Sequence, residues 1–121
     1  MKPLLEMNCQ HDDKAKVALD TYLRDQHMAE LKGWKPVNGG KGIQRIFEFK
    51  NFYHTMSFVN AVAWVANKEA HHPDMEVRYA KCVITYTTHD MDGLGINDMI
   101  CAAKINALTE IGTFGPVVQN S

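Results

Sequence analysis

Two hydrophobic periods alternate along this chain, and that alternation restricts its fold more than any other feature. Within residues 51–69 apolar side chains recur at steps of three and four, the spacing of one helix face. After Pro73 they recur at every second position up to about Thr87, as in a strand with one buried side, and residues 43–49 show mostly the same alternation. The mixture predicts an α+β domain in which helices pack against a sheet.

Two β-hairpins are expected. The first runs over residues 33–49 with Asn38-Gly39-Gly40 as its turn, because these residue types accept positive φ angles. Pro36 lacks an N–H donor, which predicts that the first strand is short or lies at a sheet edge. The second hairpin follows Pro73. A turn at Ala80-Lys81 would pair positions whose numbers sum to 161, so that apolar residues face apolar residues throughout.

Three helices complete the pattern. We expect the first over residues 12–27, the second over residues 51–69 and the third over residues 96–111. Aspartates open the first helix, and Gly112 and Pro116 end the third. The element order α-β-β-α-β-β-α predicts an α+β fold, a four-stranded antiparallel sheet with helices packed on one face.

The 121 residues suffice for one domain. We expect a loose N-terminal arm over residues 1–11, a single domain over residues 12–112 and a C-terminal tail over residues 113–121. A domain of this length buries roughly two thirds of its unfolded surface, so it needs no disulfide or metal to fold. Trp34 and Trp64 are expected to be core residues.

Composition argues against several classes of function. The 13 basic and 14 acidic residues give a formal charge of −1, so no overall basic field would attract nucleic acid. No apolar stretch is long enough to span a membrane, and residues 1–6 lack the apolar run of a signal peptide. Cys9, Cys82 and Cys101 are odd in number and widely spaced. They predict free thiols in a reducing compartment, the cytoplasm.

Three of the six histidines are expected to gather at the open end of the second hairpin. His71 and His72 precede its first strand, His89 follows its second, and the predicted register sets His72 opposite His89. Pro73 holds His72 in an extended conformation. Imidazole titrates at about pH 6.5, and neighbouring rings separate each other's pKa values. Such a cluster therefore suits a reaction in which one proton leaves while another arrives.

Two other interpretations of the histidines stay open at this point. Histidines at strand ends are often no more than polar surface residues. Alternatively, a zinc site would use His71 or His72 together with His89 and an aspartate. Structural zinc sites usually use paired thiolates, and no cysteine is close to this cluster in the sequence. We therefore predict no metal.

The histidines belong to a longer signature. Residues 67–74, Asn-Lys-Glu-Ala-His-His-Pro-Asp, are followed by Tyr79, by Thr-Thr-His-Asp at residues 87–90, by Gly93-Leu94 and by Asp98. In this order and spacing the signature resembles the pterin-4a-carbinolamine dehydratase family, and the resemblance extends from about residue 33 to residue 108. It implies an α+β enzyme that converts 4a-hydroxytetrahydropterin to quinonoid dihydropterin, which returns to aromatic amino acid hydroxylases after reduction elsewhere.

The resemblance also implies a set of site residues and partners. By position, His71, His72 and His89 match the active-site histidines of the family, and Asp98 matches a carboxylate expected to orient His89. Pterin is the substrate, with no metal and no organic cofactor, and members assemble as dimers or tetramers. The candidate site is completed by three supporting residues: Asn67, Pro73 and Thr88.

One position departs from the family pattern. Many members carry Glu where this chain has Asn67, and Asn forms hydrogen bonds but carries no charge. Glu69 lies about 200° further around the helix and is a poor substitute. We expect His71 or His89 to protonate the departing 4a-hydroxyl, another histidine to accept the N5 proton, and His72 to position the pterin.

Two other functions remain compatible with the same sequence. Some family members are dimerisation partners of a homeodomain transcription factor, so a protein-binding module is one alternative. Action on another pterin, for example in molybdopterin-related metabolism, is the second.

Overall fold

The computed structural model describes residues 2–110. Their helices and strands follow the predicted order α-β-β-α-β-β-α. The elements are α1 (Thr21–Met28), β1 (Lys35–Val37), β2 (Gly42–Glu48), α2 (Phe52–Glu69), β3 (Asp74–Val77), β4 (Lys81–Tyr86) and α3 (Ile96–Leu108). Short 3-10 turns lie at Leu4–Glu6, Asp13–Lys16, Asn38–Gly40 and His89–Met91.

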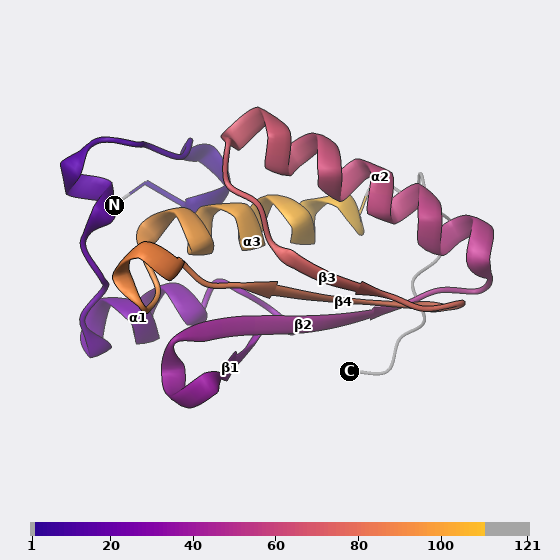
Figure 1. Cartoon of the computed structure of the whole chain (residues 1–121), viewed down its shortest axis with the longest axis horizontal. Helices are drawn as coiled ribbons and strands as arrows, with labels where there is room; N and C mark the ends of the chain where they lie inside the picture. The colour runs from indigo at the N-terminus through magenta and orange to yellow at the C-terminus, as the bar shows by residue number, and fades with distance from the viewer. Residues whose placement is uncertain (1, 111–121) are drawn as a thin grey trace.

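The four strands form one antiparallel sheet in the order β1-β2-β4-β3. Helices α2 and α3 contact each other and lie over one face of this sheet (Figure 1). Helix α1 lies at the end of the molecule near the β1–β2 turn, where Arg24 Nη1 donates to the Gly40 carbonyl at 3.4 Å. The α+β prediction is confirmed, and β1 with its Pro36 is an edge strand, as expected.

The core fills the space between the sheet and the helices α2 and α3. Fully buried side chains of the sheet meet fully buried side chains of the helices, each burial stabilising the fold by about 1.5–3 kcal/mol. The main contributors are Ile43, Phe47, Ile84, Tyr86, Phe58, Val62, Ile100 and Ile105. Trp34 is buried as expected, but Trp64 is 64% exposed. Trp64 lies two residues after Val62, about 200° around α2, and so faces away from the sheet.

The register of the second hairpin differs from the prediction. Met75 pairs with Ile84 and Val77 with Cys82, so paired positions sum to 159 rather than 161. The Arg78 N–H donates to the Lys81 carbonyl at 2.7 Å, which places the turn at Tyr79-Ala80 instead of Ala80-Lys81. A shift of two residues returns every side chain to the same face, so the matching of apolar positions does not distinguish the two registers.

The first predicted helix is divided into two segments. Asp12 caps the 3-10 turn by accepting from the Ala15 N–H at 3.1 Å, and Asp20 caps α1 by accepting from the Leu23 N–H at 2.8 Å. Val17, between the two segments, has extended φ and ψ angles. The prediction of one helix over residues 12–27 is therefore wrong, because a second N-cap residue starts a new helix at Thr21.

The N-terminal arm, which we expected to be loose, is docked against the domain. Leu4 is 1% exposed and packs in the core. The Cys9 N–H donates to Glu69 Oε1 at 2.7 Å, and Gln10 and Asn97 exchange hydrogen bonds of 3.1 and 2.7 Å. The predicted tail at residues 113–121, and the last two residues of the predicted domain, lie outside the described residues. No helix within residues 2–110 has the length and apolar character needed to cross a membrane.

Helix α2 ends in a Schellman motif that directs the chain toward the candidate site. Ala70 adopts the left-handed conformation, with φ 53° and ψ 42°. The His71 N–H donates to the Ala66 carbonyl at 3.1 Å and the Ala70 N–H to the Asn67 carbonyl at 3.3 Å, as this motif requires. The left-handed conformation costs a residue with a Cβ about 1–2 kcal/mol.

The strain at Ala70 leads to a stability prediction. Ala70→Gly should raise the free energy of unfolding by about 1 kcal/mol, because glycine adopts a positive φ without the Cβ penalty. Ala63→Gly, at an exposed right-handed position of the same helix, should lower it by about 1 kcal/mol. Urea unfolding of wild type and of both variants measures these changes in the free energy of unfolding. Equal destabilisation by the two substitutions would contradict this account of the helix end.

Candidate active site

The candidate site is organised around Asp98, a fully buried carboxylate in the first turn of α3. Its Oδ2 accepts from the Gly95 N–H at 2.9 Å and from the Thr88 hydroxyl at 2.7 Å. Its Oδ1 lies 2.6 Å from His71 Nε2. A buried carboxylate is costly unless it is hydrogen-bonded, and here both oxygens have partners while the helix N-terminus adds a favourable dipole.

The second hairpin brings the partners of Asp98 together. If the observed register is continued beyond the paired strands, His71 stands opposite Thr88, at the open end of the hairpin. Thr88 also forms an isolated antiparallel bridge with Gly93, which returns the chain toward α3. Segments that follow α2, follow β4 and open α3 therefore converge on one carboxylate.

His71 is held between Asp98 and Tyr86. Its ring stacks on the Tyr86 ring with centroids 5.4 Å apart and planes 9° apart, and the Tyr86 hydroxyl donates to the His71 carbonyl at 3.2 Å. Burial by itself would lower the pKa of His71, but the hydrogen bond to Asp98 and its negative charge outweigh burial and raise the pKa. No described residue bonds Nδ1, so this nitrogen is the one left for a ligand.

The other two candidate histidines are exposed. His72 Nε2 lies 3.1 Å from Asn67 Oδ1 on the last turn of α2. Because an amide oxygen only accepts, this contact assigns the ring proton of His72 to Nε2. His89 opens the 3-10 turn directly after Thr88, and no group among residues 2–110 hydrogen-bonds its ring. Pro73, half-buried, follows His72 at the start of β3.

Two predictions about the site are wrong, one made from the predicted hairpin register and one from the family resemblance. His72 is not set opposite His89, because positions sum to 159 and the partner position of His72 is that of Thr87. Asp98 does not orient His89. It binds His71 and Thr88, the two residues that the observed register places across from each other.

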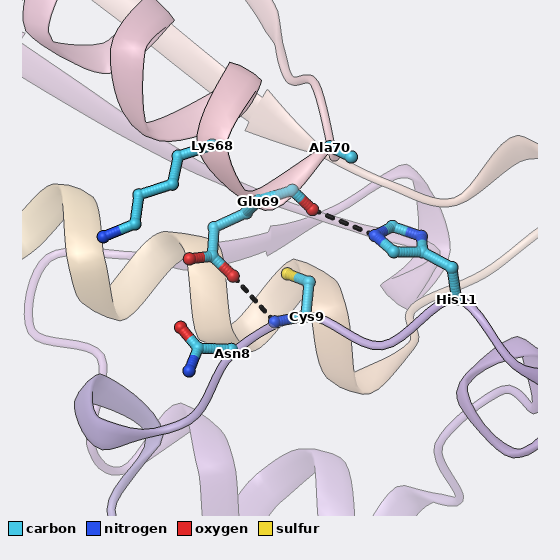
Figure 2. Close-up of a pocket in the computed structure, with 6 residues that line it drawn as sticks. All are labelled: Asn8, Cys9, His11, Lys68, Glu69 and Ala70. Atoms are coloured by element: carbon cyan, nitrogen blue, oxygen red, sulfur yellow. Dashed lines mark hydrogen bonds between the residues drawn. The ribbon is translucent and has the colours of Figure 1, made fainter.

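The arm contributes a cavity that sequence reasoning missed. A space of about 440 Å³ lies beside the end of α2, lined by Asn8, Cys9, His11, Lys68, Glu69 and Ala70 (Figure 2). Glu69 is buried, and His11 Nε2 lies 3.0 Å from its carbonyl oxygen. None of the three candidate histidines lines this cavity. The sequence signal was the Cys-Gln-His triplet at residues 9–11, which has no periodicity to place it.

The described residues contain no group of three or more His, Cys, Asp or Glu side chains arranged to hold a metal ion. The chemistry available at the site is that of imidazole and carboxylate. A histidine with a raised pKa, a fixed ring and an open nitrogen can donate a proton near neutral pH. The fold and the site together define an α+β protein in which a partly buried histidine is paired with a buried aspartate, an arrangement suited to proton transfer.

Comparison with known families gives this class a name. The family model for pterin 4 alpha carbinolamine dehydratase matches residues 17–108, and the chain belongs to this family. The match includes α1, all four strands, α2, α3 and every residue of the candidate site.

Several relatives are similar over most of their length. A protein of Stenotrophomonas maltophilia named "Putative pterin-4-alpha-carbinolamine dehydratase" is 50% identical over 95 residues, 75% of this chain and 82% of the relative. A protein of Nitrosospira multiformis with the same name is 55% identical over 86 residues, 71% of this chain and 74% of the relative.

Solved structures share the fold. A transcriptional coactivator/pterin dehydratase from Brucella melitensis has a TM-score of 0.72 and 32% identity, covering 76% of this chain and 98% of that one. A pterin dehydratase-like protein described as a RuBisCO assembly factor in the alpha-carboxysome has a TM-score of 0.57 and 20% identity, over 67% of this chain and 94% of that one. At that identity the likeness concerns the fold alone.

The His71–Asp98 pair generates a prediction about pH. Asp98→Asn should lower the pKa of His71, because the amide removes the negative charge that favours the imidazolium. A raised folded-state pKa contributes stability that is complete below the unfolded pKa of about 6.5 and is lost as pH rises through the folded pKa. The difference in unfolding free energy between wild type and Asp98→Asn should therefore be larger at low pH than at high pH.

NMR titration of the histidine ring protons measures the pKa of His71. Urea unfolding at pH values below and above that pKa measures the difference in unfolding free energy between the two proteins. A His71 pKa that does not change on Asp98→Asn would contradict the assigned role of the carboxylate.

Proposed function

We propose that this protein is a hydro-lyase that removes water from 4a-hydroxytetrahydropterin to give quinonoid dihydropterin, using histidine side chains and no metal or organic cofactor. The observation that carries the proposal is the His71–Asp98 pair in a chain that belongs to this dehydratase family: a protonatable imidazole with one ring nitrogen that no residue within 2–110 hydrogen-bonds. The substrate is the pterin itself.

The reaction needs two proton transfers. The C4a–O bond breaks with its electron pair on oxygen, which leaves as water when it receives a proton, and N5 loses its proton as the C4a–N5 double bond forms. His71 is suited to the first transfer because the hydrogen bond to Asp98 and its negative charge raise the pKa of the ring and favour its protonated form, and Nδ1 faces no described protein partner. Transfers of this kind typically contribute about 10²–10⁴-fold in rate.

His89 is our candidate for the base that accepts the N5 proton. It lies next to Thr88, which shares Asp98 with His71, and its ring has no hydrogen-bond partner among the described residues. His72 would position the pterin, with Asn67 fixing its ring. Thr88 and Asp98 act through His71, and Pro73 keeps the chain extended beyond His72.

The proposed role in the cell follows from the product. A quinonoid dihydropterin can be reduced elsewhere and returned to an aromatic amino acid hydroxylase, so the enzyme would support pterin recycling. We place it in the cytoplasm because its three cysteines are free thiols. We also propose that it is a homo-oligomer, and we place no nucleic acid and no membrane among its direct partners.

A protein-binding role is the second candidate function. The Brucella melitensis structure, at 32% identity, carries the words transcriptional coactivator in its description. On this chain, Tyr53 and Trp64 of α2 are 76% and 64% exposed, and aromatic side chains of this kind are enriched at protein interfaces. Such a role would use the outer face of α2 and would not depend on the histidines.

The test follows 4a-carbinolamine absorbance in a hydroxylase reaction supplied with the purified protein. Wild type should accelerate the decay of the intermediate, and His71→Ala should lower the rate constant by about 10²-fold or more. His89→Ala should also lower it, and His72→Ala should mainly raise KM. His54→Ala, at the opposite end of α2, is the matched control and should keep the wild-type rate.

Full activity in His71→Ala would remove His71 from the proton transfers. No acceleration by wild type with several 4a-hydroxypterins would overturn the dehydratase proposal and favour the protein-binding function. Comparison of pterins with different side chains would separate a general dehydratase from an enzyme of another pterin pathway.

A further inference from the structure

Two of the three cysteines lie in contact, although 92 positions separate them in the sequence. The sulfur atoms of Cys9, on the N-terminal arm, and Cys101, on α3, are 3.5 Å apart, and both are free thiols. A disulfide has an S–S distance of about 2.05 Å, so the two sulfur atoms are one small displacement from bonding distance.

The arm supplies both the proximity and the freedom for that displacement. Residues 7–11 have no regular secondary structure, so their backbone can shift without breaking a helix or a strand. The Cys9 N–H bond to Glu69 at 2.7 Å and the paired bonds between Gln10 and Asn97 hold this segment against α2 and α3. These polar contacts keep the Cys9 thiol beside Cys101 before any covalent bond forms.

The two cysteines differ in their access to solvent. Cys9 lines the cavity of about 440 Å³ at the end of α2, as Figure 2 shows, whereas Cys101 is fully buried. A small oxidant can therefore reach the Cys9 sulfur from the cavity, and Cys101 can reach Cys9 only from the inside. Cys101 also lies one turn after Asp98, with its sulfur 4.0 Å from the His71 carbonyl oxygen.

We propose that Cys9 and Cys101 are an oxidation site, at which a hydroperoxide forms a reversible disulfide that fastens the N-terminal arm to α3. In the first step the Cys9 thiol attacks the hydroperoxide, the O–O bond breaks, and Cys9 becomes a sulfenic acid as one water or alcohol leaves. In the second step the Cys101 sulfur attacks the Cys9 sulfur, the S–O bond breaks, and the hydroxyl leaves as water with the Cys101 proton.

The electrostatics of the pair slow the first step and favour the second. The contact with Cys101, burial and the negative charge of Glu69 raise the pKa of Cys9, so its thiol reacts with a hydroperoxide only when the oxidant is in excess. The hydrogen bond with Cys9 lowers the pKa of Cys101, although burial acts in the opposite direction. The inner sulfur is therefore the better nucleophile for the second step. Cys82 differs, because burial raises its pKa to about 11 and no cysteine sulfur is among its described contacts. Cys82 should stay a thiol under the same treatment.

The bond would change the stability of the arm. A link between residues so far apart removes a large part of the freedom of the unfolded chain, so the oxidised protein should have a Tm higher by about 10 °C or more. The arm would also be covalently held over the end of α2, and proteases should cut within residues 2–9 more slowly in the oxidised form than in the reduced form.

The experiment treats the full-length protein with hydrogen peroxide or with dithiothreitol and measures intact mass and disulfide-linked peptides. Wild type should lose about 2 Da on oxidation and yield one peptide pair joining Cys9 to Cys101, and dithiothreitol should reverse both changes. Cys82→Ala, the matched control, should behave as wild type. Cys9→Ser and Cys101→Ala should form no intramolecular link.

Several outcomes would overturn the proposal. One is a wild-type protein that gains oxygen at Cys9 without ever forming the link, and another is a link that includes Cys82 or joins two molecules. Cys9 is only partly buried, so Cys9→Ser keeps the test informative if Cys101→Ala fails to fold. The measurement is independent of dehydratase activity, so its failure would leave the proposed function intact.

Discussion

The site depends on one buried carboxylate and the groups that surround it. Asp98 has no access to water, so each oxygen must be hydrogen-bonded within the protein. Its partners, Gly95, Thr88 and His71, come from three segments that are separate in the sequence. The requirement to compensate one charge thus brings the end of α2, the end of β4 and the start of α3 together.

The rest of the fold sets the orientation of His71. The left-handed turn at Ala70 ends α2 and turns the chain toward β3, and Tyr86 supplies a flat surface for the imidazole. With Nε2 hydrogen-bonded to Asp98, the ring presents Nδ1, which has no hydrogen-bond partner in the described part of the chain. This arrangement supports a role for His71 as the proton donor, whereas the exposed ring of His89, which no described residue hydrogen-bonds, has the freedom to adjust to a ligand.

The architecture could be predicted from hydrophobic periodicity, because burial imposes it. The uninterrupted stripe of α2 and the alternation in β2 and β4 placed those elements correctly, and Pro36 placed β1 at an edge. The turn of the second hairpin could not be fixed in this way, since a shift of two residues keeps every side chain on its face. That error set His72 opposite His89, whereas the wrong expectation that Asp98 orients His89 came from the family resemblance.

The docking of the N-terminal arm against the domain could not be predicted either, but for a different reason. Its contacts are polar and distant in sequence, such as the bond between Cys9 and Glu69, 60 positions apart, and bonds of this kind leave no repeating pattern. The first helix was predicted too long because Asp20 acts as an N-cap inside a polar stretch that also suits a helix surface. Local composition did not distinguish an N-cap residue from an exposed residue within a helix.

The central claim is that Asp98 serves the reaction through His71, and a double-mutant cycle tests it most directly. Values of kcat/KM for 4a-carbinolamine dehydration would be measured for wild type, His71→Ala, Asp98→Asn and the double variant. If the carboxylate acts only by holding and charging this imidazole, Asp98→Asn will have almost no further effect once His71 is absent. Losses that multiply in the double variant would contradict the account.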